Sequence, residues 1–397
     1  MKILIICHKL PYPPKEGGSM AMNMVIEGLI NEGHDVKVFA LETNKFKLSK
    51  DIPKEYKQKT KLETLYVNIG FDPLLAIRSF ASNTSYHIRH FHKEEIFNRI
   101  EKVLNAETYD IIHFESIFLM SFLDRIKKLS KAKIVVRTHN VEHQIWSEIA
   151  DSSSNILKRS YLKQVSNSLQ KSEVEILNKA DQIISISSED TKKLKQLGVK
   201  TLIETIGFGI DVNAETDVSF SNLSIGFIGA LNWIPNDEAL KWFLESVWPK
   251  LSNKFPDLII EIAGRECPKW LKNYRVQNLN VIGEVESSKD FILKHPIFIA
   301  PIKSGSGIKI KVLEALALGR LVICSSKAIE GIPAIHKKHL IIANTVSEYI
   351  DAIQFIIENP EKIQAITKNA QDLISQHFNP LKLSKKLSEI FHHLISE

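Results

Sequence analysis

Short apolar runs alternate with helical patterns along most of the chain. Residues 2–7 (KILIIC) form a β-branched run, a helical pattern that stops at Gly33 covers residues 19–32, and residues 35–41 (DVKVFAL) form a second run. Similar runs occupy residues 109–114, 133–138 and 182–187, with helical segments between them. Runs that are apolar throughout are typical of parallel strands buried on both faces. The pattern predicts an α/β fold built on a doubly wound parallel sheet.

The same pattern restarts in the second half of the chain. Residues 211–222 are polar, and residues 223–231 (LSIGFIGAL) form a new strand and glycine turn. Four further apolar runs follow, at residues 257–264, 279–285, 296–302 and 320–326. We therefore place a linker at residues 211–222 and predict two α/β domains with a cleft between them. Ligands of such sheets bind at the carboxyl ends of the strands.

Length, composition and charge narrow the function classes. A chain of 397 residues is long enough for two or three domains, and 44% hydrophobic residues with only 16 glycines and 14 prolines exclude collagen-like and low-complexity chains. Residues 1–200 hold 31 basic and 24 acidic residues, against 21 and 22 in residues 201–397. This N-terminal excess favours an anionic partner, but it is too weak to predict nucleic-acid binding.

Cysteine spacing and hydropathy bear on the compartment. Cys7, Cys267 and Cys324 lie far apart and show no C-x-x-C spacing, which fits a reducing compartment. The apolar run at the N-terminus is too short for a signal peptide, and no stretch reaches the ~18 apolar residues of a membrane helix. We expect a cytoplasmic protein that can contact the inner face of the cell membrane peripherally.

Residues 304–319 (SGSGIKIKVLEALALG) carry the strongest chemical signal. Gly305 and Gly307 follow a predicted strand and let the backbone approach a ligand, and the following helix offers free N–H groups to phosphate. Lys309 and Lys311 add positive charge there, and Glu314 can accept hydrogen bonds from ribose hydroxyls. An ordinary strand-to-helix turn with a surface glutamate is the simpler alternative. The absence of a Walker lysine–serine signature excludes a P-loop.

A second candidate site lies at residues 137–143 (RTHNVEH). The letters of His139, Glu142 and His143 match the H-x-x-E-H zinc-peptidase pattern. However, the predicted strand runs directly into His139, which places this residue on a strand-to-helix turn rather than within a helix. A histidine at the end of a parallel strand can donate a hydrogen bond or carry a proton near neutral pH. A capping or core histidine is the alternative interpretation.

Weaker candidates lie at other strand ends and on a basic stretch. His113 and Glu115 end one predicted strand, Arg265 follows another, and the pair Gly17 and Gly18 opens the first helix. Residues 45–61 hold seven lysines against two acidic residues, and residues 78–92 mix cations with aromatic side chains. We predict from these segments an acceptor or membrane contact at Lys54, Lys57 and Arg89, with a solvated loop as the alternative.

Five segments, taken in this order, resemble the retaining, GT-B-fold glycosyltransferases of family 4. They are PYPPKEGG (11–18), THNVEH (138–143), ADQIISISSED (180–190), GFIGALNWIPN (226–236) and SGSGIKIKVLEALALGR (304–320). The resemblance implies two Rossmann-like, doubly wound domains that face a central cleft. It assigns acceptor binding to residues 1–210 and nucleotide-sugar binding to residues 211–380. A terminal helix, about residues 381–396, is expected to cross back to the first domain.

The resemblance also implies roles for individual residues. Gly17 and Gly18 would approach the donor diphosphate and sugar, His139 would contact the transferred sugar and the reaction centre, and Glu314 would bind the nucleotide ribose. Ser306 stands at the position of the first glutamate of the family's E-x7-E element. Asn232 stands where the family has the cations of its diphosphate clamp. Lys309, Lys311 and Arg265 are expected to offset that loss of charge.

The predicted activity is therefore transfer of a sugar from a nucleotide-diphosphate donor to a glycan or lipid-linked acceptor. No cofactor and no metal are expected, because lysines and helix N-termini can stabilise the leaving diphosphate. Three other functions stay open at this point. They are a non-catalytic nucleotide-sugar-binding protein, a nucleotide-sugar epimerase, and a metallohydrolase built on the H-x-x-E-H pattern.

Overall fold

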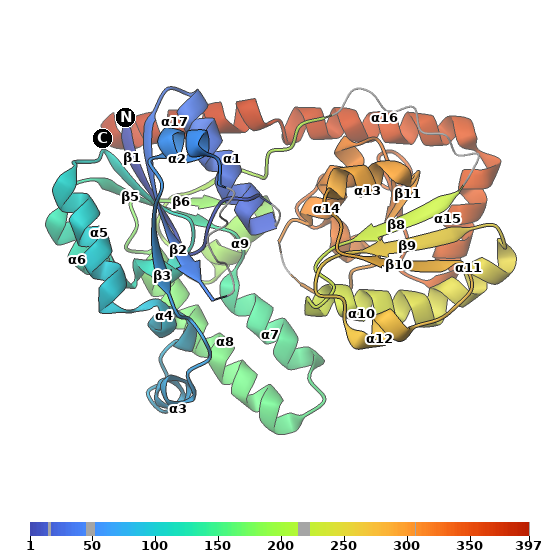
Figure 1. Ribbon diagram of the computed structural model, residues 1–397, viewed down its shortest axis with the longest axis horizontal. Coiled ribbons are helices and arrows are strands. Elements are labelled where there is room, and N and C mark those ends of the chain that lie inside the picture. Colours follow the sequence, from blue (N-terminus) through green and yellow to red (C-terminus); the bar gives the residue numbers. More distant parts are fainter. Residues whose placement is uncertain (15–16, 45–51, 213–222, 306, 397) are drawn as a thin grey trace. The chain divides into compact units, whose positions relative to one another are not determined.

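The structure is a computed structural model of the 397-residue chain and describes residues 1–14, 17–44, 52–212, 223–305 and 307–396. The chain divides into two compact units (Figure 1). Unit 1 consists of Met1–Gly209 and Pro380–Glu397, and unit 2 consists of Ile210–Asn379. Most of the predicted linker, from residue 213 to residue 222, lies outside the described residues.

Unit 1 contains, in its described residues, a seven-stranded parallel sheet with the strand order β3-β2-β1-β4-β5-β6-β7. The strands are β1 (Lys2–Cys7), β2 (Asp35–Thr43), β3 (Glu63–Val67), β4 (Ile111–Phe114), β5 (Lys133–Thr138), β6 (Gln182–Ser185) and β7 (Ile203–Thr205). The connecting helices are α1 (Gly17–Asn31), α2 (Lys54–Thr60), α3 (Pro73–Ala81), α4 (Tyr86–Phe91), α5 (Glu94–Ala106), α6 (Leu123–Leu129), α7 (Glu142–Ser152), α8 (Ile156–Leu177) and α9 (Ser188–Gln196). A 3-10 turn, Ile117–Phe122, precedes α6.

Strand β1 explains why the apolar runs are continuous. Ile3 and Ile5 pack on one face of the sheet in a cluster with residues of α1, whereas Leu4 and Ile6 pack on the other face with residues of α5 and α8. All four side chains are almost completely buried. A strand covered by helices on both faces has no solvent side, so no polar alternation is retained in its sequence.

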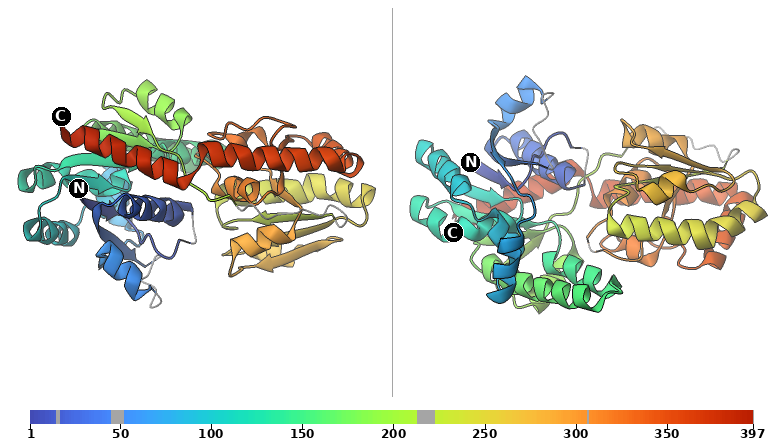
Figure 2. Two further views of the ribbon diagram at one scale, coloured as in Figure 1. Left: turned by 90° about the horizontal axis from the view of Figure 1, so that it is seen from above. Right: turned by 60° about the horizontal axis from the view of Figure 1, so that its bottom comes forward.

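The last helix, α17 (Pro380–Ser396), belongs to unit 1 and packs against α1 (Figure 2). Leu387 and Phe391 of α17 join the same apolar cluster as Val25 and Leu29 of α1. His34 adds a polar contact, because its Nε2 lies 2.7 Å from the hydroxyl of Ser388. The C-terminal segment thus completes the core of a unit that is otherwise formed by the first half of the chain.

Unit 2 contains, in its described residues, a six-stranded parallel sheet with the order β10-β9-β8-β11-β12-β13. The strands are β8 (Ser224–Ile228), β9 (Ile259–Ala263), β10 (Leu279–Gly283), β11 (Ile297–Ala300), β12 (Leu321–Cys324) and β13 (Ile341–Ile342). The helices are α10 (Ile234–Trp242), a π turn (Phe243–Val247), α11 (Trp248–Lys254), α12 (Lys269–Asn273), α13 (Ser288–Lys294), α14 (Ile310–Ala317), a 3-10 turn (Ser326–Ile329), α15 (Val346–Glu358) and α16 (Pro360–His377).

Both sheets confirm the predicted α/β fold class, and each reverses its strand order at one place. In unit 1 the order reverses between β1 and β4, and in unit 2 between β8 and β11. Connections leave such neighbouring strands in opposite directions, which opens a crevice at their carboxyl ends. The fold therefore marks two places, one in each unit, where functional side chains should gather.

The packing of α17 makes a first prediction. Phe391→Ala removes a fully buried ring from the cluster that α17 shares with α1, so we expect the free energy of unfolding to fall by about 3–5 kcal/mol. The matched control is Ile395→Ala on the same helix, whose side chain is 37% exposed and should cost no more than about 0.5 kcal/mol. Urea denaturation of both variants measures the difference, and equal values would show that α17 is not part of the unit 1 core.

Candidate functional site

Three side chains from distant parts of the sequence meet at the carboxyl edge of the unit 1 sheet. His8 follows β1, Glu115 follows β4, and His139 follows β5. Strands β1, β4 and β5 are direct neighbours in the sheet. Because parallel strands end at the same edge, their first loop residues lie close together.

The carboxylate of Glu115 is completely buried and is contacted by three side chains. His113 Nε2 lies 3.1 Å from its Oε1, while His139 Nε2 and Arg137 Nη1 lie 2.7 Å and 3.4 Å from its Oε2. Burial alone would raise the pKa of Glu115, but the Arg137 charge and the two histidine bonds hold it well below its ordinary value. Glu115 is therefore ionised and forms the centre of the group.

His139 is the most accessible member of this group, with 14% of its side chain exposed. It lies between the end of β5 and the start of α7, as the sequence predicted. Burial lowers its pKa, and the bond to Glu115 offsets only part of that effect, while Arg137 and Lys9 lower it further. The imidazole is therefore neutral at pH 7, with one ring nitrogen held by Glu115.

The loop after β1 brings further groups to the same edge. His8 Nδ1 lies 3.0 Å from the backbone carbonyl oxygen of Glu115, and burial, Lys9 and His139 lower the pKa of His8 to about 3. The predicted pair Gly17 and Gly18 forms the first turn of α1. A Cβ atom at position 18 would lie 2.6 Å from Lys9 Nζ, so glycine leaves room for the lysine there.

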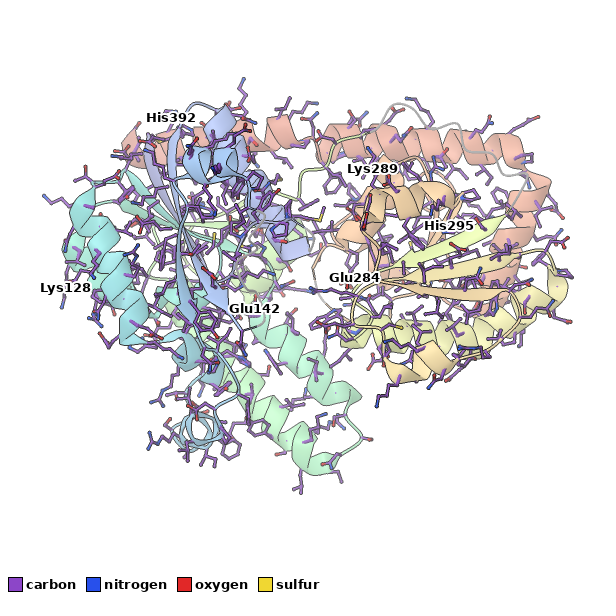
Figure 3. All side chains as sticks on the ribbon, in the orientation of Figure 1. Lys128, Glu142, Glu284, Lys289, His295 and His392 are labelled. Atoms are coloured by element: carbon purple, nitrogen blue, oxygen red, sulfur yellow. The ribbon has the colours of Figure 1, made fainter. Side chains whose placement is uncertain are left out.

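The second histidine of the H-x-x-E-H pattern has a different partner. His143 Nδ1 lies 2.7 Å from Glu173 Oε2 of α8, and the backbone N–H of Glu142 donates to the other oxygen of Glu173 at 2.9 Å. Figure 3 labels Glu142 at the start of α7, where burial and the charge of Glu173 raise its pKa to about 8. His139 and His143 thus contact separate carboxylates. Within the described ranges, no group of three His, Cys, Asp or Glu side chains is arranged to hold a metal.

In unit 2 the glycines that the sequence singled out lie in the loop after β11. Gly305 and Gly307 have φ angles of +91° and +80°, in the left-handed region that favours glycine. Their carbonyl oxygens accept hydrogen bonds from Lys309 Nζ at 2.9 Å and 2.8 Å. Lys309 therefore holds the loop that leads into α14. Ser306, between the two glycines, lies outside the described residues.

Lys311 lies in the first turn of α14 and contacts the end of β8. Its Nζ lies 2.8 Å from Asn236 Oδ1 and 4.2 Å from the centre of the Phe227 ring. Burial, reinforced by Lys309, lowers the pKa of Lys311 to about 7. Among the side chains that the structure describes, no carboxylate forms an ion pair with it. Lys311 is thus a partly buried amine whose described contacts are an amide oxygen and an aromatic face.

Glu314 lies one helical turn beyond Lys311 and is also partly buried. Burial raises its pKa to about 7. No described side chain donates a hydrogen bond to its carboxylate, and it forms no ion pair with Lys311. The start of α14 therefore holds a cation and a carboxylate that both lack an opposite charge.

Two other predicted donor residues, Asn232 and Arg265, also belong to unit 2. Asn232 is exposed in the turn after β8, where its side-chain amide donates to the carboxylate of Glu266. Arg265 follows β9 and is partly exposed. The amide that contacts Lys311 is Asn236, four residues beyond Asn232.

The predicted acceptor or membrane residues lie on two helices of unit 1. Lys54 and Lys57 are exposed on α2, and Arg89 is exposed on α4. The Arg89 guanidinium contacts the hydroxyls of Ser82 and Thr84 at 3.4 Å and 3.2 Å. The rest of the basic stretch, residues 45–51, lies outside the described part of the chain.

Sequence reasoning missed three features of these sites. It paired Glu115 with His113 but not with His139 and Arg137, because that contact depends on strand order. It also missed Asn236, although the place of this residue in the first helical turn after the GFIG strand was a signal that could have found it. The third feature is a cavity of about 270 Å³ in unit 2, where Lys303 Nζ lies 3.5 Å from the centre of the Trp242 ring.

Comparison with known proteins identifies the family. Residues 16–214 match the family described as "Glycosyltransferase Family 4", and residues 222–359 match "Glycosyl transferases group 1". The first match alone spans half of the chain. The chain belongs to glycosyltransferase family 4. This confirms the family that the five sequence segments indicated.

Similar proteins cover nearly the whole chain. A Klebsiella pneumoniae protein described as "Uncharacterized 44.6 kDa protein in cps region" is 24% identical over 393 residues, 96% of this chain and 97% of that protein. The structure of Anabaena Alr3699/HepE in complex with UDP is similar with a TM-score of 0.67 and 14% identity, over 99% of this chain and 100% of that one. Sucrose-phosphate synthase from Thermosynechococcus elongatus gives a TM-score of 0.71 and 15% identity, over 100% and 99%. The two structural likenesses show the GT-B fold.

Hydropathy adds one finding on the described helices. None of them combines the length and the apolar character that crossing a bilayer requires.

The isolated carboxylate on α14 makes a second prediction. Burial favours the protonated form of Glu314, so its ionisation lowers stability progressively as pH rises from about 4.5 to about 7. Glu314→Gln removes that cost, and we expect the variant to be more stable than the parent by about 1–3 kcal/mol at pH 8 and equal to it near pH 4. Chemical denaturation at the two pH values measures this.

The control for that prediction is Glu361→Gln, which changes an exposed glutamate of α16 in the same unit. It should leave stability unchanged at both pH values. A Glu314→Gln protein that is less stable than the parent at pH 8 would show that the carboxylate has a stabilising partner.

Proposed function

We propose that this protein is a retaining glycosyltransferase that transfers a sugar from a nucleotide-diphosphate sugar to a glycan or lipid-linked acceptor. The proposal includes a place in the synthesis of a cell-surface polysaccharide or glycolipid. The observation that carries it is the pair of uncompensated charges on α14, Lys311 and Glu314. The HepE structure contains UDP, and the Klebsiella relative is described as a protein of a cps region, which supports the donor class and the setting.

A nucleoside diphosphate supplies the groups that the start of α14 lacks. Its phosphates would bring negative charge to Lys311 and to the free N–H groups at the helix N-terminus. The ribose hydroxyls would donate to the carboxylate of Glu314. Gly305 and Gly307 would let the loop approach this ligand, with Ser306, Lys309, Asn232 and Arg265 around it as further donor contacts.

The proposed chemistry needs positive potential more than a strong protein base. In a retaining transfer the transition state resembles an oxocarbenium ion, and the leaving diphosphate stays near the attacking hydroxyl and takes its proton. Lys311 and the N-terminus of α14 would stabilise the charge that develops on the diphosphate. Because these groups supply the charge, we propose a reaction that requires no metal. His139 would contact the transferred sugar, and Gly17 and Gly18 would make room for the donor.

We further propose that residues 1–210 bind the acceptor and that this part of the protein contacts an anionic membrane surface. Besides Lys54, Lys57 and Arg89, support comes from α3, whose large side chains face solvent. Leu74 and Ile77 of α3 are 67% and 66% exposed, whereas the small residues Ala76 and Ser79 are buried against the protein. A helix with its apolar face exposed, packed against the helix that carries Arg89, fits the interface of a bilayer.

The donor site can be tested by the proton balance of nucleotide binding. At pH 8 Lys311 is largely neutral, and a diphosphate beside it would favour the charged form. We therefore expect UDP binding at pH 8 to take up a fraction of a proton, at most about one. Calorimetry in buffers of different ionisation enthalpy measures this uptake. Lys311→Met should abolish it and weaken binding by about 10-fold or more.

The control is Lys250→Met, an exposed lysine of α11, which should retain both affinity and proton uptake. UDP, GDP, ADP and their sugars should be screened in the same way, and transfer to glycan or glycolipid acceptors should follow with the donor that binds. If no nucleotide binds, or if Lys311→Met binds as the parent does, the proposed donor site is wrong. Release of an altered sugar without any acceptor would indicate an epimerase instead.

Membrane contact is tested separately with vesicles. We expect co-sedimentation with vesicles that contain phosphatidylglycerol, and about 30-fold weaker partitioning for Lys54→Gln/Lys57→Gln because each lysine near an anionic surface contributes about 1 kcal/mol. Leu74→Ser/Ile77→Ser should weaken it similarly. The control is Ile335→Ser in unit 2, which is 54% exposed in the parent. Equal partitioning of all these variants, or no partitioning of the parent, would refute a bilayer contact on α2 and α3.

A further inference from the structure

Unit 1 holds two carboxylate–histidine pairs with the same separation. Glu115 Oε2 lies 2.7 Å from His139 Nε2, and Glu173 Oε2 lies 2.7 Å from His143 Nδ1. Both carboxylates are completely buried. The pairs differ in which ring nitrogen the carboxylate holds and in the accessibility of the histidine, since 14% of the His139 side chain is exposed against 9% for His143.

The bond to Glu115 determines where the proton of His139 resides. An ionised carboxylate can only accept hydrogen bonds, so Nε2 of His139 must carry the proton. In the neutral ring Nδ1 then has a lone pair and acts as an acceptor. None of the described side chains bonds this Nδ1, and 14% of the His139 side chain is exposed to solvent. The ring therefore offers Nδ1 as an acceptor, while its Nε2–H donates to the buried Glu115.

The groups packed around the pair keep this arrangement in place. Arg137 contacts the same carboxylate and also donates to the backbone carbonyl of Ala21 on α1 at 3.0 Å. His113 occupies the second oxygen of Glu115, and His8 donates to its backbone carbonyl. Both carboxylate oxygens of Glu115 are therefore bonded to side chains inside unit 1. Rotation of the carboxylate away from His139 would also break its contacts to His113 of β4 and Arg137 of β5.

We propose that Glu115 is a positioning residue that fixes His139 in the tautomer with the proton on Nε2, so that Nδ1 accepts a hydrogen bond from a hydroxyl of the donor sugar. The inference deepens the role proposed above for His139 and rests on it. No proton is transferred in this contact. A histidine fixed as an acceptor favours a sugar that carries a hydroxyl at the contacted carbon over the corresponding deoxy-sugar, because the analogue leaves Nδ1 unpaired.

The direct test is nitrogen NMR of the histidine side chains in the full-length protein, with His139 assigned by its loss in His139→Asn. We expect a protonated Nε2 and an unprotonated Nδ1 in the parent at pH 7. Glu115→Gln should produce a mixture of tautomers, because an amide can either donate or accept. Glu115→Asp keeps the charge and should restore part of the parent spectrum.

The kinetic test uses the same variants with the donor that the nucleotide screen identifies. We expect Glu115→Gln to lower kcat for transfer by about 10–100-fold, the range typical of groups that orient a functional histidine. UDP affinity should stay unchanged, because its proposed site lies on α14. The acid limb of the pH profile should move to lower pH, since the Glu115 charge is what raises the pKa of His139, while burial, Arg137 and Lys9 lower it. Preference for the hydroxylated donor over its deoxy analogue should fall.

The matched control is Glu173→Gln, which removes the charge from the other carboxylate–histidine pair. It should leave the His139 tautomer, the pH profile and the donor preference unchanged. If Glu115→Gln fails to fold because Arg137 is left without its counter-charge, the double variant Glu115→Gln/Arg137→Met removes both charges together. The double variant should show the same mixed tautomers.

Two results would overturn the inference. One is a parent protein in which His139 carries its proton on Nδ1. The other is a folded Glu115→Gln protein with the parent tautomer and parent kinetics. The NMR result does not depend on activity, so it stands even if the nucleotide screen finds no donor. Absence of nucleotide binding would refute the proposed function, whereas a wrong tautomer would refute only the role of Glu115.

Discussion

Burying a charged side chain without an opposite charge destabilises the folded state, and the two units of this protein meet that constraint in different ways. In unit 1 the buried carboxylate of Glu115 is compensated from within by Arg137 and by two histidines. In unit 2 Lys311 and Glu314 are partly buried on one helix without compensation from any described side chain. The Glu115 charge is therefore balanced within its own unit, whereas in the proposed function a ligand would supply the charges and hydrogen bonds that Lys311 and Glu314 lack.

The position of both groups follows from the topology of parallel sheets. Each lies where strand order reverses, at β1 and β4 in unit 1 and at β8 and β11 in unit 2. At such a place the loop residues are held by strands that are buried on both faces, so their backbone is fixed by the core. That rigidity allows a lysine such as Lys311 to be kept in an environment that lowers its pKa to about 7. A solvated loop would relax and restore an ordinary lysine.

The sequence predicted the central strands and the family, because continuous apolar runs and glycine turns leave a direct trace in the order of residues. It did not predict β3, β7 and β13, which are short edge strands without such runs. It singled out His139 and Glu314 individually, but the contact of His139 with Glu115 depends on the adjacency of β4 and β5. The same limit explains why the sequence pointed to Asn232 rather than Asn236. Both are polar residues that follow β8, and only the folded path of the chain decides that Asn236 contacts Lys311.

We propose above that the uncompensated charges of α14 form the donor site of this glycosyltransferase. The most direct measurement is an experimental structure of the full-length protein with a bound nucleoside diphosphate. We expect a phosphate oxygen within hydrogen-bonding distance of Lys311 Nζ and a ribose hydroxyl at the carboxylate of Glu314. A nucleotide bound elsewhere, with Lys311 still held only by Asn236 and Phe227, would contradict it.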